Sequence, residues 1–148
     1  MIERIKYLAK ELQDNIVDIR RQIHQFPGLS FAEYETAEFI HSLLTSWNIE
    51  HEFVTETGIV AIIKGKNPEK KTIALRADID ALPIQEKNEC SYRSSNAGVM
   101  HACGHDAHAA MLLGAANILN QLKDEFEGTI KLIFQPGEEK LPGGASCT

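Results

Sequence analysis

The sequence predicts a protein of the α/β class with a mixed sheet flanked by helices. Near the start of the chain, apolar residues recur at three- and four-residue steps, which is the spacing of an amphipathic helix. Further along, short runs rich in β-branched residues are bounded by glycine, proline and charged residues, as strands are. The two patterns alternate along all 148 residues without a linker or an internal repeat, so one α/β unit is expected.

Three helices are expected. The apolar stripe of the first runs from Ile2 to Ile23 and predicts a single long helix with one buried face. Ser30 and Glu33 have the spacing of a capping box, so a second helix is expected to begin after them. Residues 107–122 are rich in alanine and leucine and apolar on most sides, which predicts a third helix buried against the sheet. The inward face of the second helix would be formed by Tyr34, Ala37, Ile40, Leu44 and Trp47.

Four segments have the composition of strands, namely residues 52–55, 59–63, 72–75 and 129–135. Residues 64–71 carry four lysines and are expected to form a solvated hairpin loop between the second strand and the third. Residues 82–98 show no periodicity, and a loop of this length in a compact domain is usually functional or mobile. This loop would deliver the next segment, residues 100–105, to a site.

The segment 101–108 holds three histidines, a cysteine and an aspartate within eight residues. Cys103 and His105 are two positions apart, so in a loop both side chains can reach one divalent ion. Thiolate, imidazole and carboxylate are ligands of zinc and its first-row neighbours. A simpler interpretation is a helix start that Asp106 caps, with the histidines as ordinary polar residues. The density of ligand side chains favours a metal site.

Acidic residues follow two of the expected strands. Glu138 and Glu139 come soon after the fourth strand, and Asp78 and Asp80 follow the third. Ligands of an open α/β sheet bind beyond the carboxyl ends of its strands, so these acids and the segment 101–108 could share one site. One glutamate could bind a metal while the other transfers protons, and Asp78 or Asp80 could orient a ligating histidine or bridge metals. Alternatively, Glu138 and Glu139 lie in a solvated turn, and Asp78 or Asp80 simply ends a strand and begins a turn.

Four blocks of the sequence resemble the metal-dependent amidohydrolases related to aminoacylase and carboxypeptidase G. The resemblance is to the branch that contains hippurate hydrolase, indole-acetyl-amino-acid hydrolase and N-acetyl-diaminopimelate deacetylase. The order and spacing of the blocks fit along nearly the whole chain. The blocks are residues 21–30 with Glu33, residues 76–83, residues 100–108, and residues 135–139 with 143–145.

This resemblance implies a partial zinc-peptidase-like catalytic domain and assigns its site. Cys103, His105 and Glu139 would be ligands of one or two divalent ions, either zinc, manganese, cobalt or nickel. Glu138 would be the general base, and Asp78 would be the acid that supports the active site. The implied reaction is hydrolysis of the amide bond of small-molecule substrates, either N-acyl amino acids or short peptides.

The catalytic domain of the resembling family is longer than this chain and supplies further metal-ligating histidines. The family also inserts a smaller domain that mediates dimerisation and closes over the substrate. We therefore expect residues 1–148 to be the amino-terminal part of a catalytic domain, with a homodimer possible only in the full-length protein.

Two other functions remain open. A truncated domain could lack activity and bind metal weakly or not at all. Alternatively, Cys103 could be the nucleophile of a hydrolase with His105 or His108 as its base, although a base two residues away is poorly placed to reach the thiolate.

Composition excludes several other classes. The hydrophobic fraction of 43% and the charged fraction of 24% are ordinary for a globular domain. A net charge of -6 offers no basic surface to nucleic acid or to an anionic membrane. No apolar run approaches the length of a membrane helix, so the cytoplasm is the expected compartment. The three cysteines do not suggest a disulfide framework, and Cys90 and Cys147 are expected to lie outside the site.

Overall fold

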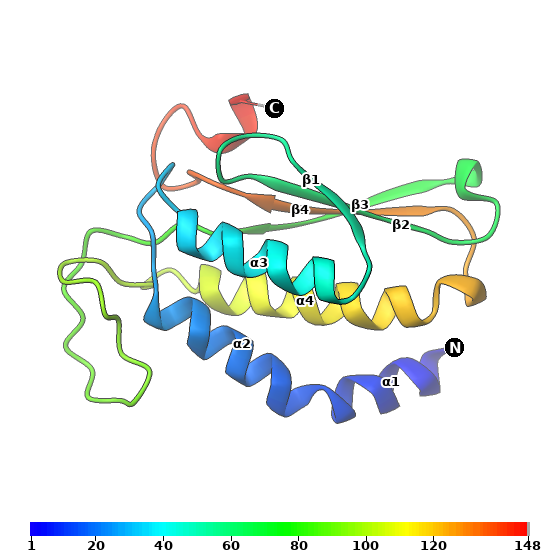
Figure 1. Ribbon diagram of the computed structural model, residues 1–148, viewed down its shortest axis with the longest axis horizontal. Helices are drawn as coiled ribbons and strands as arrows, with labels where there is room; N and C mark the ends of the chain where they lie inside the picture. The colour runs from blue at the N-terminus through cyan, green and yellow to red at the C-terminus, as the bar shows by residue number, and fades with distance from the viewer. Residues whose placement is uncertain (148) are drawn as a thin grey trace.

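The computed structural model describes residues 1–147, apart from the side chain of Cys147. The expectation for Cys147 therefore falls outside the described residues. The α/β class is confirmed, with a mixed sheet and helices (Figure 1). The helices are α1 (Ile2–Glu11), α2 (Gln13–Gln25), α3 (Tyr34–Ser46) and α4 (His105–Gln121), and the strands are β1 (Glu50–Phe53), β2 (Ile59–Lys64), β3 (Thr72–Asp78) and β4 (Thr129–Gln135). Short 3₁₀ helices lie at Pro68–Lys70, Lys123–Glu125 and Gly144–Cys147.

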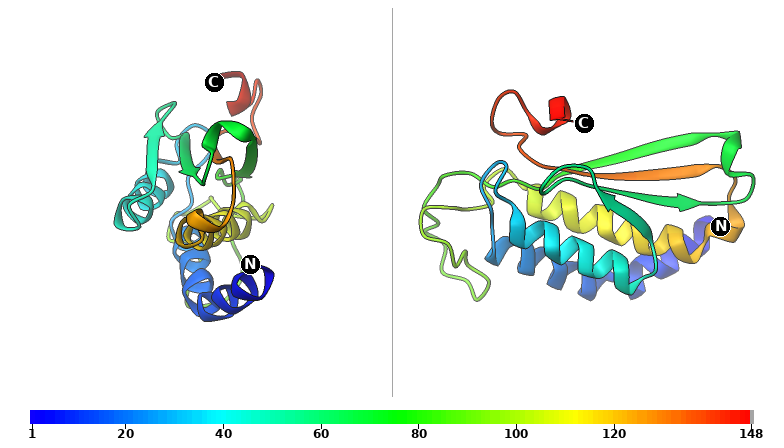
Figure 2. Two further views of the ribbon diagram at one scale, coloured as in Figure 1. Left: turned by 90° about the vertical axis from the view of Figure 1, so that its right-hand side faces the viewer. Right: turned by 45° about the horizontal axis from the view of Figure 1, so that its top comes forward.

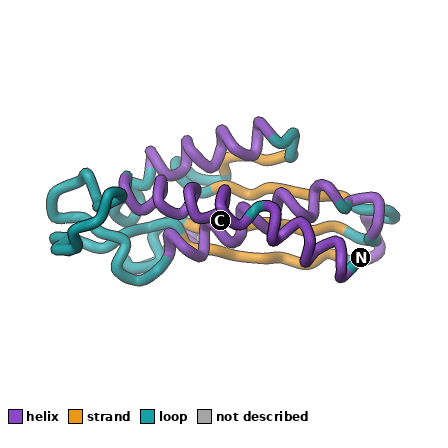
Figure 3. The backbone as a smooth tube through the Cα atoms, turned by 90° about the horizontal axis from the view of Figure 1, so that it is seen from below, coloured by secondary structure: helices purple, strands orange, loops and turns teal. Residues whose placement is uncertain are grey.

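The α-helices form two layers on one face of the sheet, as Figure 2 shows. α3 and α4 make the layer next to the strands, with α4 against β2, β3 and β4 and α3 against β1 and β2. α1 and α2 pack on α4 and make the outer layer. Seen from below, the helices stand in front of the strands (Figure 3). Within the described residues the sheet is therefore flanked by α-helices on this face.

The strand order of the sheet is β1-β2-β4-β3. β4 pairs with β2 in antiparallel orientation and with β3 in parallel orientation. The predicted hairpin between β2 and β3 is wrong, because β4 lies between these two strands. The connection instead passes the start of β4, where the amide of Gly65 donates to the carbonyl of Gly128 at 2.9 Å. The lysines indicated a solvated loop but carried no information about which strands pair.

β3 is an edge strand, and most of its length is exposed. Ile73 and Leu75 are 45% and 37% exposed. Toward its carboxyl end the chain becomes buried, with Ala77 at 4% and Ile79 at 0% exposure. The amide of Ile79 donates to the carbonyl of Gln135 at 3.0 Å and so continues the pairing of β3 with β4 by one residue. The carboxyl ends of the two parallel strands are consequently held side by side.

The long amino-terminal helix predicted from the apolar stripe is divided at Leu12. Main-chain hydrogen bonds from Leu12 to Leu8 and from Ile16 to Leu12, both 2.9 Å long, span the join between α1 and α2. Figure 1 shows the two helices at an angle to one another. Ile23 in α2 is 1% exposed, whereas Ile2 in α1 is 66% exposed. The stripe is therefore buried mainly in α2, because α1 lies along the outer side of α4 and away from the sheet.

The two remaining helices agree better with the predictions. In α3, the residues Ala37, Ile40 and Leu44 are buried as expected, but Tyr34 is 56% exposed and does not face the core. α4 begins two residues earlier than expected and lies between the sheet and the outer helices, which explains its apolar composition. No helix among the described residues is long and apolar enough to cross a membrane.

Candidate metal centre

Three segments meet at the carboxyl ends of β3 and β4. Asp80 lies two residues beyond β3, and Glu138 and Glu139 lie shortly beyond β4. α4 begins at the same edge of the sheet with His105, directly after the loop that carries Cys103. Gly104 permits this arrangement because it adopts the left-handed φ of 94°, which disfavours side chains larger than hydrogen. The sheet and α4 thus bring together residues from three distant parts of the sequence.

The side chains of Cys103, His105 and Glu139 each offer one ligand atom, and these atoms all lie within 4.8 Å of one another. Zinc binds sulfur, nitrogen and oxygen at roughly 2.0 to 2.3 Å, so ligands of one tetrahedral ion lie roughly 3 to 4 Å apart. The three side chains therefore fit a shared ion after a small contraction. His105 is buried, whereas Cys103 and Glu139 are exposed, so the cluster is open on one side.

His105 is held in one tautomer by Asp80. Its Nδ1 lies 3.0 Å from the main-chain oxygen of Asp80 and 3.1 Å from the carboxylate oxygen Oδ1. A carbonyl oxygen only accepts hydrogen bonds, so Nδ1 carries the proton and donates. The lone pair of Nε2 is then free, which is the form of a histidine that ligates a metal.

The Asp80 carboxylate also fixes Glu139. Its second oxygen, Oδ2, accepts hydrogen bonds from the main-chain amide of Glu139 at 2.9 Å and from the hydroxyl of Ser30 at 2.7 Å. Asp80 is 1% exposed, so these contacts are shielded from water. One buried carboxylate therefore orients two of the three clustered residues.

Asp80, and not Asp78, makes the hydrogen bonds to His105 and Glu139 in this structure. The Asp78 carboxylate is instead paired with the Arg76 guanidinium, at 2.8 Å from Nη2 and 2.9 Å from Nε. Both acids stand two positions apart near the end of one strand, and an alternating pattern places such residues on the same face. The sequence could not choose between them, because the choice depends on where the pairing of β3 with β4 ends.

Glu138, the predicted general base, lies beside the ligand cluster. Its Oε2 is 3.9 Å from Nε2 of His105, the nitrogen that faces the metal position. The side chain is 41% exposed and is therefore accessible to water. Glu138 is thus adjacent to the cluster without being one of its three ligand residues.

Cys103 is a poor candidate for a nucleophile. A hydrogen bond from its thiol to the Glu139 carboxylate, together with desolvation and the charges of nearby acids, raises the pKa of Cys103. Nucleophilic cysteines instead have lowered pKa values, so the thiolate is disfavoured here in the absence of a cation. His108 is exposed and its ring centre lies 6.3 Å from that of His105, so it is not one of the three clustered ligand residues.

His101 is buried, with 4% exposure, and neither of its ring nitrogens has a hydrogen-bond partner within the described residues. Burial lowers the pKa of His101 to about 4, although the nearby carboxylates of Asp106 and Asp80 oppose this shift. The ring is therefore neutral near pH 7. Of the three histidines in the segment 101–108, only His105 belongs to the ligand cluster.

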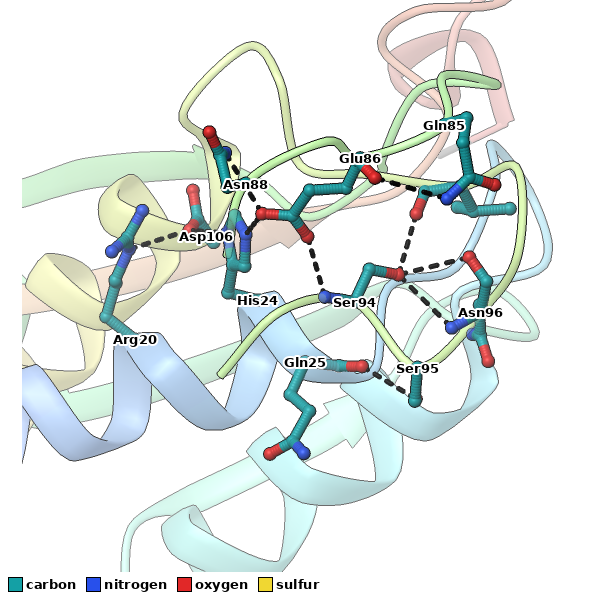
Figure 4. Close-up of polar contacts among 11 residues, drawn as sticks. Arg20, His24, Gln25, Gln85, Glu86, Asn88, Ser94, Ser95, Asn96 and Asp106 are labelled. Atoms are coloured by element: carbon teal, nitrogen blue, oxygen red, sulfur yellow. Dashed lines mark hydrogen bonds and ion pairs between the residues drawn. The ribbon is translucent and has the colours of Figure 1, made fainter. Parts of the chain in front are cut away.

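A second buried polar cluster connects the loop before α4 to α2 (Figure 4). Nδ1 of His24 lies 2.8 Å from Asp106 Oδ2, and its Nε2 lies 3.1 Å from Glu86 Oε1. Arg20 Nε donates to the same Asp106 oxygen at 2.7 Å, and Glu86 accepts the amide of Ser94 at 2.6 Å. His24 lies in the last turn of α2. No periodicity indicated its contacts with Glu86 and Asp106, which lie far along the chain.

The capping box predicted at Ser30 and Glu33 is wrong. α3 has no side-chain cap hydrogen bond, and the Ser30 hydroxyl donates to Asp80 instead. Glu33 is 0% exposed and accepts the amide of Gly137 at 2.9 Å and the hydroxyl of Thr57 at 2.7 Å. Local spacing suggested a helix cap because it could not show that both side chains turn toward the sheet.

Sequence comparisons identify related proteins. The sequence profile of Peptidase family M20/M25/M40 matches residues 74–147, half of the chain. The chain is 47% identical over 144 residues to an N-acyl-L-amino acid amidohydrolase of Geobacillus stearothermophilus, covering 97% of this chain and 39% of that protein. It is 46% identical over 141 residues to thermostable carboxypeptidase 1 of Saccharolobus solfataricus, covering 94% of this chain and 36% of that protein.

A solved structure shows the same architecture. The YXEP protein of Bacillus subtilis, described as a dinuclear metal-binding peptidase of the M20 family, superimposes with a TM-score of 0.84 at 45% identity. The match covers 90% of this chain and 38% of that protein. The chain therefore spans less than half the length of these relatives. The matched profile, the sequence identity and the shared fold lead to one conclusion: this chain belongs to peptidase family M20/M25/M40.

Proposed function

We propose that residues 1–148 form the amino-terminal part of the catalytic domain of a metal-dependent amidohydrolase that cleaves N-acyl amino acids or short peptides. The observation that carries this proposal is the position of Glu138, whose carboxylate lies 3.9 Å from the His105 nitrogen that faces the metal position. The names of the relatives, an N-acyl-L-amino acid amidohydrolase and a carboxypeptidase, support the substrate class. A homodimer is proposed only for the longer protein.

Cys103, His105 and Glu139 are the proposed metal ligands. A thiolate, an imidazole and a carboxylate suit zinc, manganese, cobalt or nickel better than calcium or magnesium, which prefer oxygen. A related structure described as dinuclear supports a site for one or two ions. Such an ion would polarise the amide carbonyl and lower the pKa of water at the site.

Glu138 is the proposed general base. Its exposed carboxylate can take a proton from the attacking water and return it to the departing amine. Asp80 contributes indirectly, because it keeps the Nδ1 proton of His105 in place and holds the main chain of Glu139. This chain would thus supply the general base and three metal ligands, two of which are oriented by Asp80.

The proposed position of the acyl group is a pocket of about 400 Å³ beside Glu139. Pockets of this kind hold an apolar group against hydrophobic walls, while a few polar groups fix its orientation. The pocket would place an apolar acyl group next to the metal ligands. Its lining residues are Leu29, Ser30, Ala32, Ala81, Leu82, Pro83, Glu139 and Lys140.

A chimera tests the proposal. Residues 1–148 would replace the matching segment of the Geobacillus amidohydrolase, to which they are 47% identical. We expect the chimera to hydrolyse N-acetyl or N-benzoyl amino acids when loaded with zinc, manganese, cobalt or nickel, and to lose activity on chelation. The 148-residue chain alone is expected to be inactive. A folded, metal-loaded chimera that hydrolyses none of these substrates would contradict the proposed function.

A further inference from the structure

Glu33 is a buried carboxylate that the proposed reaction does not use. It is not one of the three clustered residues, and its side chain is 0% exposed. Burial of a charged group is costly unless hydrogen bonds compensate for the lost water. The hydrogen-bond partners of Glu33 therefore show which segments its buried carboxylate holds together.

Donors from three segments surround the Glu33 carboxylate. Oε1 accepts the amides of Phe31 and Gly137, each at 2.9 Å, and Oε2 accepts the hydroxyl of Thr57 at 2.7 Å. Phe31 lies in the same turn as Glu33, Thr57 precedes β2, and Gly137 follows β4. The carboxylate thus ties the turn after β4 to the segment before α3.

Both amides bound by Oε1 belong to residues with left-handed backbones. Phe31 has a φ of 66° and Gly137 has a φ of 61°. A Cβ atom at position 137 would lie 2.5 Å from the Phe31 ring, so only glycine lets the two turns pack this closely. A left-handed conformation at a residue other than glycine is unfavourable and persists when its surroundings hold it. The charge-assisted hydrogen bonds of Glu33 supply such a restraint.

The turn restrained by Glu33 continues directly into Glu138 and Glu139. The next fixed point is the amide of Glu139, which donates to Asp80 at 2.9 Å. Asp80 in turn accepts the hydroxyl of Ser30, three residues before Glu33. The segment 30–33 therefore restrains the turn on both sides of Glu138. Glu33 binds Gly137 directly, and Ser30 binds Asp80, which in turn binds Glu139.

We propose that Glu33 is a positioning residue, which holds the turn 136–139 so that Glu139 meets Cys103 and His105 at the metal position. This inference rests on the metal-binding part of the proposed function. It assigns Glu33 a role through the main chain of the turn and no contact with metal or substrate. Loss of the carboxylate should therefore weaken metal binding in chains that remain folded.

Cobalt binding to the 148-residue chain tests this role without an activity assay. The charge-transfer absorbance between the Cys103 thiolate and Co²⁺ reports occupancy of the site, and far-ultraviolet circular dichroism reports folding. We expect Glu33→Gln to weaken Co²⁺ affinity about 10- to 100-fold, the usual cost of losing a group that supports a metal ligand. Glutamine keeps the shape of the side chain and can offer its NH₂ group to the Thr57 hydroxyl, which can accept, but it is neutral, so the hydrogen bonds from the Phe31 and Gly137 amides lose the charge that strengthens them.

Two matched variants separate positioning from stability. Thr57→Val removes the Oε2 bond but leaves both Oε1 bonds, so Co²⁺ affinity should stay within about threefold while the melting temperature falls. Tyr34→Phe removes an exposed hydrogen bond to Glu56 next to Glu33 and should change neither quantity appreciably. Equal loss of affinity in Thr57→Val and Glu33→Gln, or an unchanged affinity in Glu33→Gln, would overturn the positioning role.

A measurement on the wild-type chain covers the case in which Glu33→Gln does not fold. Hydrogen exchange of the Gly137 amide should slow when Zn²⁺ is added, because metal binding and the Glu33 contact stabilise the same turn. Unchanged exchange at Gly137 would overturn the inference. If the wild-type chain gives no cobalt band that Cys103→Ser abolishes, the metal site itself is wrong, and the role of Glu33 fails with it.

Discussion

The carboxylate of Asp80 lies 3.1 Å from Nδ1 of His105, and its other oxygen holds the amide of Glu139. This contact pairs a buried acid with a proposed ligand histidine that lies 25 residues further along the chain. It gives the site a specific, testable dependence on residue 80.

Asp80→Asn should weaken Co²⁺ binding to the chain about 10- to 100-fold, as expected for a supporting partner of a ligand histidine. Asparagine would keep one acceptor for His105 but would turn its NH₂ group toward the Glu139 amide, which is also a donor. Asp78→Asn is the matched control, because Asp78 is paired with Arg76, and we expect a change below about threefold. Titration of both variants with Co²⁺ measures the two affinities. An equal loss of Co²⁺ affinity in Asp80→Asn and Asp78→Asn would mean that Asp80 has no special role.

Glu138→Gln in the chimera should lower kcat by about 10² to 10⁴, the range for removal of a general acid–base group. Metal affinity should be retained, because Glu138 is not one of the three clustered residues. Glu139→Gln provides the contrast, since loss of a ligand should reduce metal content first. Steady-state kinetics combined with metal analysis distinguish the two, and wild-type turnover in Glu138→Gln would exclude it as the base.

Alkylation should report coordination of Cys103. Iodoacetamide should modify the exposed Cys103 more slowly in the zinc-loaded chain than after chelation, because coordination occupies the thiolate lone pair. Cys90 is a free, half-buried cysteine in the same chain and serves as an internal reference whose rate should change little. Peptide mass spectrometry can follow both sites at once. Equal rates at Cys103 with and without zinc would argue against its role as a ligand.

Glu86 should make the fold sensitive to acid. Burial by itself would raise the pKa of Glu86, but hydrogen bonds from the Ser94 amide, His24 and Asn88 outweigh this effect and lower it. The unfolded chain, with a pKa of about 4.3 at this residue, therefore binds more protons than the folded chain just below that pH. The stability contributed by Glu86 is present above about pH 4.3 and is lost as the pH falls through the lowered pKa.

Urea unfolding at several pH values measures this effect. The difference in unfolding free energy between wild type and Glu86→Gln should be largest near pH 6 and should shrink as the pH falls through about 4.3 and below. Glu89→Gln, an exposed change in the same loop, should show no such trend. A constant difference across this range would mean that the Glu86 charge does not stabilise the fold.

Much of this site could be predicted because its chemistry is local. Cys103 and His105 stand two residues apart, and Glu138 and Glu139 are adjacent, so each pair could be recognised within one short segment. The two pairs were expected to lie close together in space, because ligand sites of α/β sheets lie at the carboxyl ends of the strands. The structure places the ligand atoms of Cys103, His105 and Glu139 within 4.8 Å of one another.

The missed features all depend on contacts between distant segments. Glu33 had a complete local explanation as part of a capping box, and only the fold shows that its partner is Gly137, 104 residues away. β4 enters the sheet between β2 and β3, and no property of either strand indicated this insertion. Asp78 and Asp80 were distinguishable only once the end of the β3 and β4 pairing was known.

The pairing of β3 with β4 also makes the metal centre a reporter of strand register. Asp78 lies opposite Gln135 in this register, and the chain then places Asp80 against the amide of Glu139 across a separation of 59 residues. A shift of one residue would turn each side chain of the slipped strand to the opposite face and would separate these two groups. Parallel pairing between distant segments is slow to form during folding. A metal ion that binds at this site would therefore bind only chains in which β3 and β4 have paired in the correct register. Binding would stabilise these chains relative to chains in which the two strands are misaligned.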